Sequence, residues 1–127
     1  IALSDIKVVL PGILAYSGTK FINYDQAKNE VDTLIDNLEK IDLGGFPLII
    51  LCDDASFTAE SLNNFVWVTF TRSNPSHDVY GIGSFTKNKH WGCKGSLIID
   101  ARKKPHHAPE LVTDKAIEES VAKWLKF

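Results

Sequence analysis

Two neighbouring carboxylates, Asp53 and Asp54, are the first side chains in this sequence whose type and position suggest chemistry. They follow a run of apolar residues, and open α/β sheets usually present ligand groups where a central strand ends. One interpretation is therefore a contact to a divalent metal or a ribose. We favour the other, because no glycine-rich phosphate loop accompanies the pair: one carboxylate caps a short helix beginning near Thr58, and the other is solvated.

His90 and Cys93 form a second group, with a spacing found among zinc ligands. A tetrahedral zinc site needs four converging ligands, and a nucleophilic thiol needs an activating base and an oxyanion donor. Only this pair has ligand-like spacing, and Cys52 lies in an apolar run, where a free thiol behaves as a small buried hydrophobe. We therefore expect no metal site, no catalytic residue and no disulfide in this chain, with residues 92–95 forming a tight turn.

Residues 73–96 are rich in glycine, asparagine, serine and lysine and predict a long loop, which is uncommon in compact domains unless it has a function. Aromatic and cationic side chains in this loop suit an interface or an aromatic carboxylate, since rings give apolar contact and a cation offsets the acid's charge. The alternative is that the aromatic rings hold the loop against its own domain. The candidates for the substrate side are Phe85, His90, Trp91 and Lys94.

The hydrophobic pattern alternates between strand and helix periods. Strands are expected at 6–10, 13–16, 46–52, 65–71 and 97–101, and helices at 24–40, from Thr58, and at 114–127. In the strand at 65–71, alternation places Val66, Val68 and Phe70 on one face. Arg72 at its end is expected to pair with Asp78 or Asp100. This order predicts one domain over residues 1–127, a three-layer α/β/α sandwich around a small, mostly parallel or mixed sheet.

Composition excludes several classes of protein. The formal net charge of −2 and the pI near 6.1 give no electrostatic reason to bind nucleic acid or an anionic membrane. No apolar run approaches the ~20 residues that span a bilayer. We expect a cytoplasmic protein, with membrane association through a lipophilic substrate as the alternative.

The last helix ends in large apolar residues that must find a partner surface. We interpret them as contacts to a neighbouring subunit, and packing on their own domain is the alternative. The residues are Val121, Trp124, Leu125 and Phe127.

Several segments together resemble the C-terminal region of the UbiD-family decarboxylases. They are Val-Trp-Val-Thr-Phe-Thr-Arg at 66–72, Asn-Pro at 74–75, Lys-His-Trp-Gly-Cys-Lys-Gly at 89–95 and Leu-Ile-Ile-Asp-Ala-Arg at 97–102. With 46–54 upstream, they cover roughly half of the chain. The absence of methionine and the start at Ile1 suggest a fragment, so we expect the C-terminal domain of a longer enzyme.

The resemblance implies a parent that decarboxylates a polyprenyl-hydroxybenzoate-like acid in quinone biosynthesis, using prenylated FMN with Mn²⁺ and K⁺. It implies an N-terminal cofactor domain in the same protein, which holds the catalytic residues, and a homo-oligomer. The 127-residue chain alone is then expected to be inactive and to bind none of these cofactors. A non-enzymatic α/β interaction module is the alternative.

Overall fold

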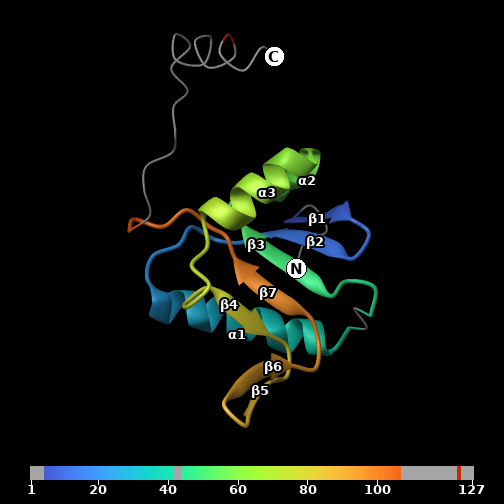
Figure 1. The fold of residues 1–127 in the computed structure, drawn as a ribbon, viewed down its shortest axis with the longest axis vertical. Helices are drawn as coiled ribbons and strands as arrows, with labels where there is room; N and C mark the ends of the chain where they lie inside the picture. Colours follow the sequence, from blue (N-terminus) through green and yellow to red (C-terminus); the bar gives the residue numbers. More distant parts are fainter. Residues whose placement is uncertain (1–4, 42–43, 107–122, 124–127) are drawn as a thin grey trace.

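A five-stranded mixed sheet forms the centre of the computed structural model, which describes residues 5–41 and 44–106 together with Lys123. Its strand order is β1-β2-β3-β7-β4 (Figure 1). Strands β2, β3 and β7 run parallel, and the edge strands β1 and β4 pair antiparallel to their neighbours. The elements of the sheet are β1 (Ile6–Leu10), β2 (Ile13–Ser17), β3 (Leu48–Cys52), β4 (Val79–Gly81) and β7 (Leu97–Asp100).

Helix α1 (Tyr24–Glu39) covers one face of the sheet, and α2 (Ala55–Glu60) and α3 (Leu62–Thr71) cover the other (Figure 1). Each face has its own apolar core. Val31, Leu34 and Leu38 of α1 pack against Ile49 and other strand residues on one side. On the opposite side, the buried side chains are Ala15, Ile50, Cys52, Ala55, Phe65, Val68 and Ala101. The predicted three-layer α/β sandwich with a mixed sheet is confirmed.

Helix α1 forms where the sequence predicts it. Asn23 caps its first turn, where the side-chain oxygen accepts a hydrogen bond of 2.8 Å from the backbone N–H of Gln26. The buried residues Ala27, Val31, Leu34 and Leu38 recur every three or four positions and give the helix one apolar stripe toward the sheet.

The strand predicted at 65–71 is wrong, because this segment belongs to helix α3. Its valines, threonines and aromatics favour strands, but β-propensity yields to packing when the apolar positions also fit a helix. Val68 and Thr69 follow Phe65 by three and four residues, and all three are buried. Ser61 caps the helix by accepting a hydrogen bond of 3.0 Å from the N–H of Asn64.

The short helix predicted to begin near Thr58 begins three residues earlier, as α2. Asp54 is its N-cap and accepts a hydrogen bond of 3.1 Å from the N–H of Phe57. Thr58 lies inside the helix, where its buried hydroxyl donates to the carbonyl of Asp54 at 2.9 Å. The prediction that one of the two carboxylates caps this helix is confirmed for Asp54.

The predicted loop at 73–96 is also wrong, since it contains three strands. After β4, the chain forms a two-stranded hairpin of β5 (Ser84–Lys87) and β6 (His90–Cys93), which lies apart from the main sheet (Figure 1). Asn88 and Lys89 connect the two strands with φ values of 52° and 65°, as a tight two-residue hairpin turn requires. The tight turn predicted at 92–95 is therefore displaced, because Gly92 and Cys93 belong to β6.

Other predictions fall on the C-terminal part of the chain. The helix expected at 114–127, with Val121, Trp124, Leu125 and Phe127, lies outside the described residues. Among the residues that are described, none of the helices combines the length and the apolar character needed to cross a bilayer.

Candidate functional site

The carboxyl ends of the three parallel strands meet at one edge of the sheet, where open α/β folds usually place their functional groups. β2 leads to Thr19, β3 to Asp53 and β7 to Asp100. The extended residues after β7 bring Arg102 and Lys104 to the same edge. We call Asp78, Asp100, Arg102 and Lys104 the buried charge cluster, because all four side chains form ion pairs and are 0% exposed.

Arg102 is held on two sides. Its Nε and Nη2 donate to the two carboxylate oxygens of Asp100 at 2.9 and 2.8 Å, the two-pronged geometry that makes arginine–carboxylate pairs strong. Its Nη1 donates to Glu30 of α1 at 2.5 Å and to the backbone carbonyl of Thr19 at 2.9 Å. One guanidinium thus joins β7, helix α1 and the segment after β2.

Lys104 joins a different set of elements. Its Nζ donates to the backbone carbonyls of Arg72 and Asp100, both at 2.8 Å, and to that of Arg102 at 3.1 Å. The same nitrogen lies 3.4 Å from Asp78 and 3.7 Å from Asp100. Since Arg72 is the C-cap of helix α3, this lysine fixes the C-terminal end of α3 to the chain that leaves β7.

The electrostatics of the cluster follow from burial and pairing. Burial alone would lower the pKa of Arg102, but hydrogen bonding and charge from Asp100, and then from Glu30, outweigh it, so the pKa is raised. Tyr24 lies close by, and burial together with the negative charge of Asp78 raises its pKa to about 12. Both side chains therefore keep their protons at neutral pH.

The buried charge cluster serves as a structural clamp, because it holds β7, α1, α3 and the segment after β2 together. The donors of Arg102 and Lys104 are directed at protein oxygens, and neither side chain is exposed. This cluster was not predicted from the sequence. A signal was present, because Asp100, Arg102 and Lys104 alternate along extended chain and alternate residues share one side of such a backbone.

Asp53 and Arg72 lie beside the clamp and correct two expectations. Asp53 is not merely solvated, since its Oδ2 accepts a hydrogen bond of 2.8 Å from the N–H of Lys103. The same oxygen lies 3.6 Å from Nη1 of Arg72, whose predicted partners were Asp78 and Asp100. Those two carboxylates instead face Lys104, because the chain after β7 carries that lysine into the buried edge.

A small aromatic group covers the outside of the clamp. The rings of His77 and His106 lie 5.5 and 5.6 Å from the ring of Tyr24, and the Tyr24 hydroxyl is 3.1 Å from Nε2 of His106. Phe21 packs edge-on against Tyr24 at 5.2 Å and lies under the cations of Arg102 and Lys104, at 5.7 and 5.6 Å. These rings separate the paired charges from water.

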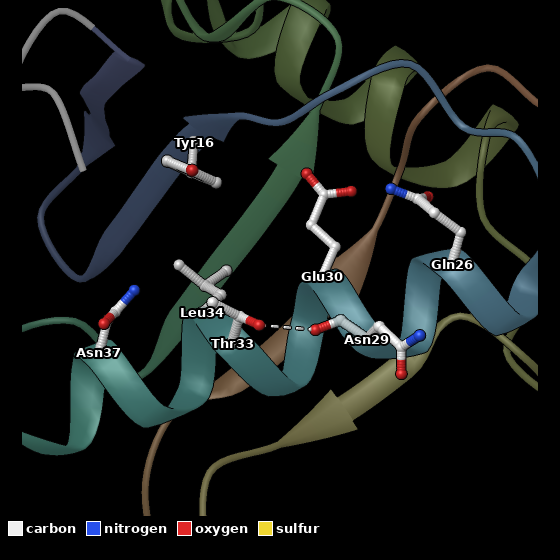
Figure 2. A pocket seen from close by; sticks show the side chains of 7 residues that line it. All are labelled: Tyr16, Gln26, Asn29, Glu30, Thr33, Leu34 and Asn37. Atoms are coloured by element: carbon white, nitrogen blue, oxygen red, sulfur yellow. Dashed lines mark hydrogen bonds between the residues drawn. The ribbon is translucent and has the colours of Figure 1, made fainter.

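A pocket of about 330 Å³ lies next to the clamp, between α1 and β2 (Figure 2). Figure 2 shows Tyr16 across from the helix and Glu30 between them, with the carboxamide of Gln26 nearby. Glu30 is already engaged by Arg102 and by Thr19, whose hydroxyl donates to it at 2.9 Å. Burial, and secondarily the charge of Glu30, raises the pKa of Tyr16. Apart from Glu30 the lining is uncharged and includes the apolar Leu34, so it supplies no cation to pair with an anionic ligand.

The four substrate-side candidates do not converge. In the β5–β6 register, Phe85 pairs with Gly92 and Lys87 with His90, which puts Phe85 and His90 on one face of the hairpin. Trp91 pairs with Thr86 on the other face and lies against Gly81. Lys94 follows β6 and lines a separate pocket at the start of β3. Phe85 and Trp91 remain 45% and 49% exposed, so the hairpin presents an aromatic ring on each face.

Cys52 and Cys93 are both free, and Cys52 is buried as the apolar run predicts. The described residues include no group of three or more histidine, cysteine, aspartate or glutamate side chains placed to hold a metal ion.

Burial of Cys52 is expected to make the free energy of unfolding decrease at alkaline pH. Desolvation raises the pKa of this thiol from 9.0 to about 11, so the folded state holds the proton more tightly than the unfolded state. The resulting stability is complete below pH 9 and is lost as the pH rises toward 11, by about 2–3 kcal/mol at most. Chemical denaturation at pH 8, 9, 10 and 10.5 should show a shallower loss in Cys52→Ala than in the parent. Equal slopes would contradict this assignment.

Comparison with known proteins relates the chain to a decarboxylase. No protein-family model matches it. Over 81 residues, 64% of the chain, it is 33% identical to a protein of Chlamydia pneumoniae named as a 4-hydroxybenzoate decarboxylase subunit. The chain is homologous to part of that protein. An uncharacterized protein of Chlamydia muridarum is 32% identical over 91 residues. The matches span only 14% and 16% of these relatives' lengths.

Among solved structures, the chain is similar to the vanillic acid decarboxylase of Sedimentibacter hydroxybenzoicus in its open form. The similarity covers 91% of this chain and 27% of that one, with a TM-score of 0.47 and 20% sequence identity.

Proposed function

We propose that this chain is part of a UbiD-family decarboxylase that removes CO₂ from an aromatic acid of the 4-hydroxybenzoate type. The observation that carries the proposal is the 33% identity over 81 residues to the 4-hydroxybenzoate decarboxylase subunit of Chlamydia pneumoniae. The polyprenyl-hydroxybenzoate substrate of quinone biosynthesis is the finer form of the same proposal. Release of CO₂ from 4-hydroxybenzoate by the full-length protein tests it.

The cofactors implied by this family are prenylated FMN, Mn²⁺ and K⁺, with the flavin acting as an electron sink when bound. The described residues do not form a site that fits the flavin or the two metal ions. None of them forms a candidate metal cluster, and the buried cations Arg102 and Lys104 are engaged by protein oxygens. We therefore assign cofactor binding to residues outside the described part of the chain, within a full-length protein comparable in length to the relatives.

The described part of the chain would then have a supporting role. Its clamp stiffens the carboxyl edge of the sheet, and the β5–β6 hairpin offers aromatic and cationic side chains to a neighbouring domain or to the substrate side. Residues 79–99 include Lys87, Lys89 and Lys94 and no acidic residue, which suits an anionic or acidic surface. The Chlamydia pneumoniae relative is named as one subunit of its enzyme, which also supports a partner protein for this chain.

Replacing Trp91 with alanine tests whether the hairpin lies on the substrate side. In the full-length enzyme, Trp91→Ala should lower kcat/KM for the aromatic acid about tenfold, because half of the indole is available for contact with whatever the hairpin faces. Phe57→Ala is the matched control, since this ring is 41% exposed and belongs to α2, which lies away from the hairpin (Figure 1). Unchanged kcat and KM in Trp91→Ala would remove the hairpin from the substrate side.

A further inference from the structure

Helix α1 carries a row of uncharged polar side chains beside its apolar stripe. Asn29, Thr33 and Asn37 recur every four residues, and Gln26 precedes them by three, so all four share one side of the helix. We call Gln26, Asn29, Thr33 and Asn37 the polar α1 row. All four line the pocket of about 330 Å³ between α1 and β2 (Figure 2). Pockets of about 300–1,000 Å³ typically hold one small molecule, so this one is large enough for a ligand.

The same pocket has an apolar side. Figure 2 shows the side chain of Tyr16 across from the helix, with Leu34 on the helix side. Leu34 is 4% exposed and belongs to the apolar core, against which Tyr16 is partly packed. A tyrosine ring has a flat apolar face and one polar edge. The pocket therefore combines an apolar contact surface with the hydrogen-bonding groups of the polar α1 row.

Two of the lining side chains have hydrogen-bonding capacity left over. Within the described part of the chain, Gln26 Oε1 is buried without a hydrogen-bond partner, which costs free energy until water or a ligand supplies a donor. Its terminal torsion has a broad range, so a rotation can bring this oxygen to the pocket. Glu30 Oε1 accepts one hydrogen bond, of 2.9 Å from the backbone N–H of Thr19, and a carboxylate oxygen can accept two. Both oxygens can therefore receive a donor from a ligand.

These groups restrict the chemical class of the ligand. A side-chain carboxamide offers two donors and one acceptor, so the ligand must both accept and donate. A carboxylate only accepts, and the pocket supplies no cation to pair with it. An ammonium group only donates, and the carboxylate in the lining, Glu30, is already paired with Arg102. Hydroxyl groups both donate and accept, and a sugar ring adds C–H groups that make apolar contact with an aromatic face.

We propose that the pocket between α1 and β2 binds a neutral sugar. The sugar ring packs on Tyr16, and its hydroxyl groups bond to the polar α1 row and to Glu30. The proposed function assigns no ligand to this pocket, and the sugar site does not depend on the reaction that the full-length protein catalyses.

Saturation-transfer NMR on the full-length protein tests for this site directly. The probes are D-glucose and maltose, and putrescine serves as the amine control. We expect transfer to the ring protons of at least one of the two sugars, with a Kd of about 1–10 mM, as suits a few hydrogen bonds and one ring contact.

Four variants locate the binding. Asn37→Ala should raise the Kd about fivefold through lost hydrogen bonds, and Asn37 is exposed, so its replacement does not threaten the fold. Tyr16→Leu should act similarly because the ring is lost, whereas Tyr16→Phe keeps the ring and should stay within about twofold. Asp36→Ala is the matched control and should leave the Kd unchanged, because Asp36 is exposed beside Asn37 but does not line the pocket.

A weaker Kd in Asn37→Ala with an unchanged Kd in Asp36→Ala supports the proposal, because the two variants alter different sides of α1. This pair decides alone if Tyr16→Leu does not fold. No transfer to either sugar would overturn the proposal, as would a Kd in Asn37→Ala equal to that of the parent. Transfer to putrescine and to neither sugar would replace the sugar site with an amine site.

Discussion

Replacing Asp100 with alanine is expected to lower the free energy of unfolding by about 3–5 kcal/mol, because it removes a buried carboxylate that two buried cations share. Arg102 would lose both of its bonds to Asp100 and keep only Glu30 as a carboxylate partner, and Lys104 would lose one of its two buried anions. Neither cation can turn to solvent, since both side chains are 0% exposed. Urea denaturation of the variant and the parent, followed by circular dichroism, measures the difference.

Asp32→Ala is the control for this prediction. Asp32 also pairs with a lysine, Lys28, at 3.2 Å, but the two side chains are 54% and 70% exposed. An exposed pair of this kind contributes about 0.3–0.5 kcal/mol, so its loss should be small. If Asp100→Ala and Asp32→Ala changed stability equally, the clamp would not stabilise the fold.

Lys104→Met is expected to destabilise the protein by a similar amount, about 3–5 kcal/mol. Methionine fills much of the same volume but cannot donate, so the carboxylates of Asp78 and Asp100 and the carbonyl of Arg72, the C-cap of α3, would lose their shared donor. The C-terminal end of α3 should loosen first, since its tether is lost. Denaturation gives the total effect, and hydrogen exchange of residues 68–72 reports the local one.

A second substitution separates the loss of the charge from the loss of packing. Asp78→Asn removes one of the anions that face Lys104, so the double variant should be less destabilised than the sum of the two single variants. Lys20→Met is the control, because Lys20 is exposed, and its effect should stay within about 0.5 kcal/mol. Strict additivity of Asp78→Asn and Lys104→Met would contradict a coupled cluster.

The parts of the fold that follow from hydrophobic period alone could be predicted from the sequence. The stripe of Ala27, Val31, Leu34 and Leu38 fits only a helix, and the apolar runs at 48–52 and 97–100 have the length of buried strands. These three elements determine the layered architecture, so the fold class was correct although other segments were assigned wrongly.

Two segments could not be assigned because their local signals conflict with the packing. At 65–71, every residue is apolar or β-branched and so favours a strand, yet Phe65, Val68 and Thr69 also fit one face of a helix, and packing against the sheet decides between the two. At 84–93, the turn residues Asn88 and Lys89 adopt positive φ without a glycine, so the usual hairpin signal is missing.

The alternation of Asp100, Arg102 and Lys104 is visible in the sequence, but the partners that these residues reach across the fold could not be predicted, because those contacts join residues far apart in the sequence. Arg102 reaches Glu30 across 72 positions, and Lys104 reaches the carbonyl of Arg72 across 32. Burial decides their role, since the same side chains on the surface would have been candidates for binding an anion. The four substrate-side candidates are close in sequence but do not converge, because successive residues of a strand point to opposite faces.

Release of CO₂ from 4-hydroxybenzoate by the full-length protein, produced in cells that make prenylated FMN, is the decisive measurement for the decarboxylase assignment. Stoichiometric formation of phenol and CO₂, or conversion of a closely related hydroxybenzoate, is the result that the assignment predicts. A folded protein that carries no flavin and converts no hydroxybenzoate would contradict it and would favour a non-enzymatic interaction module.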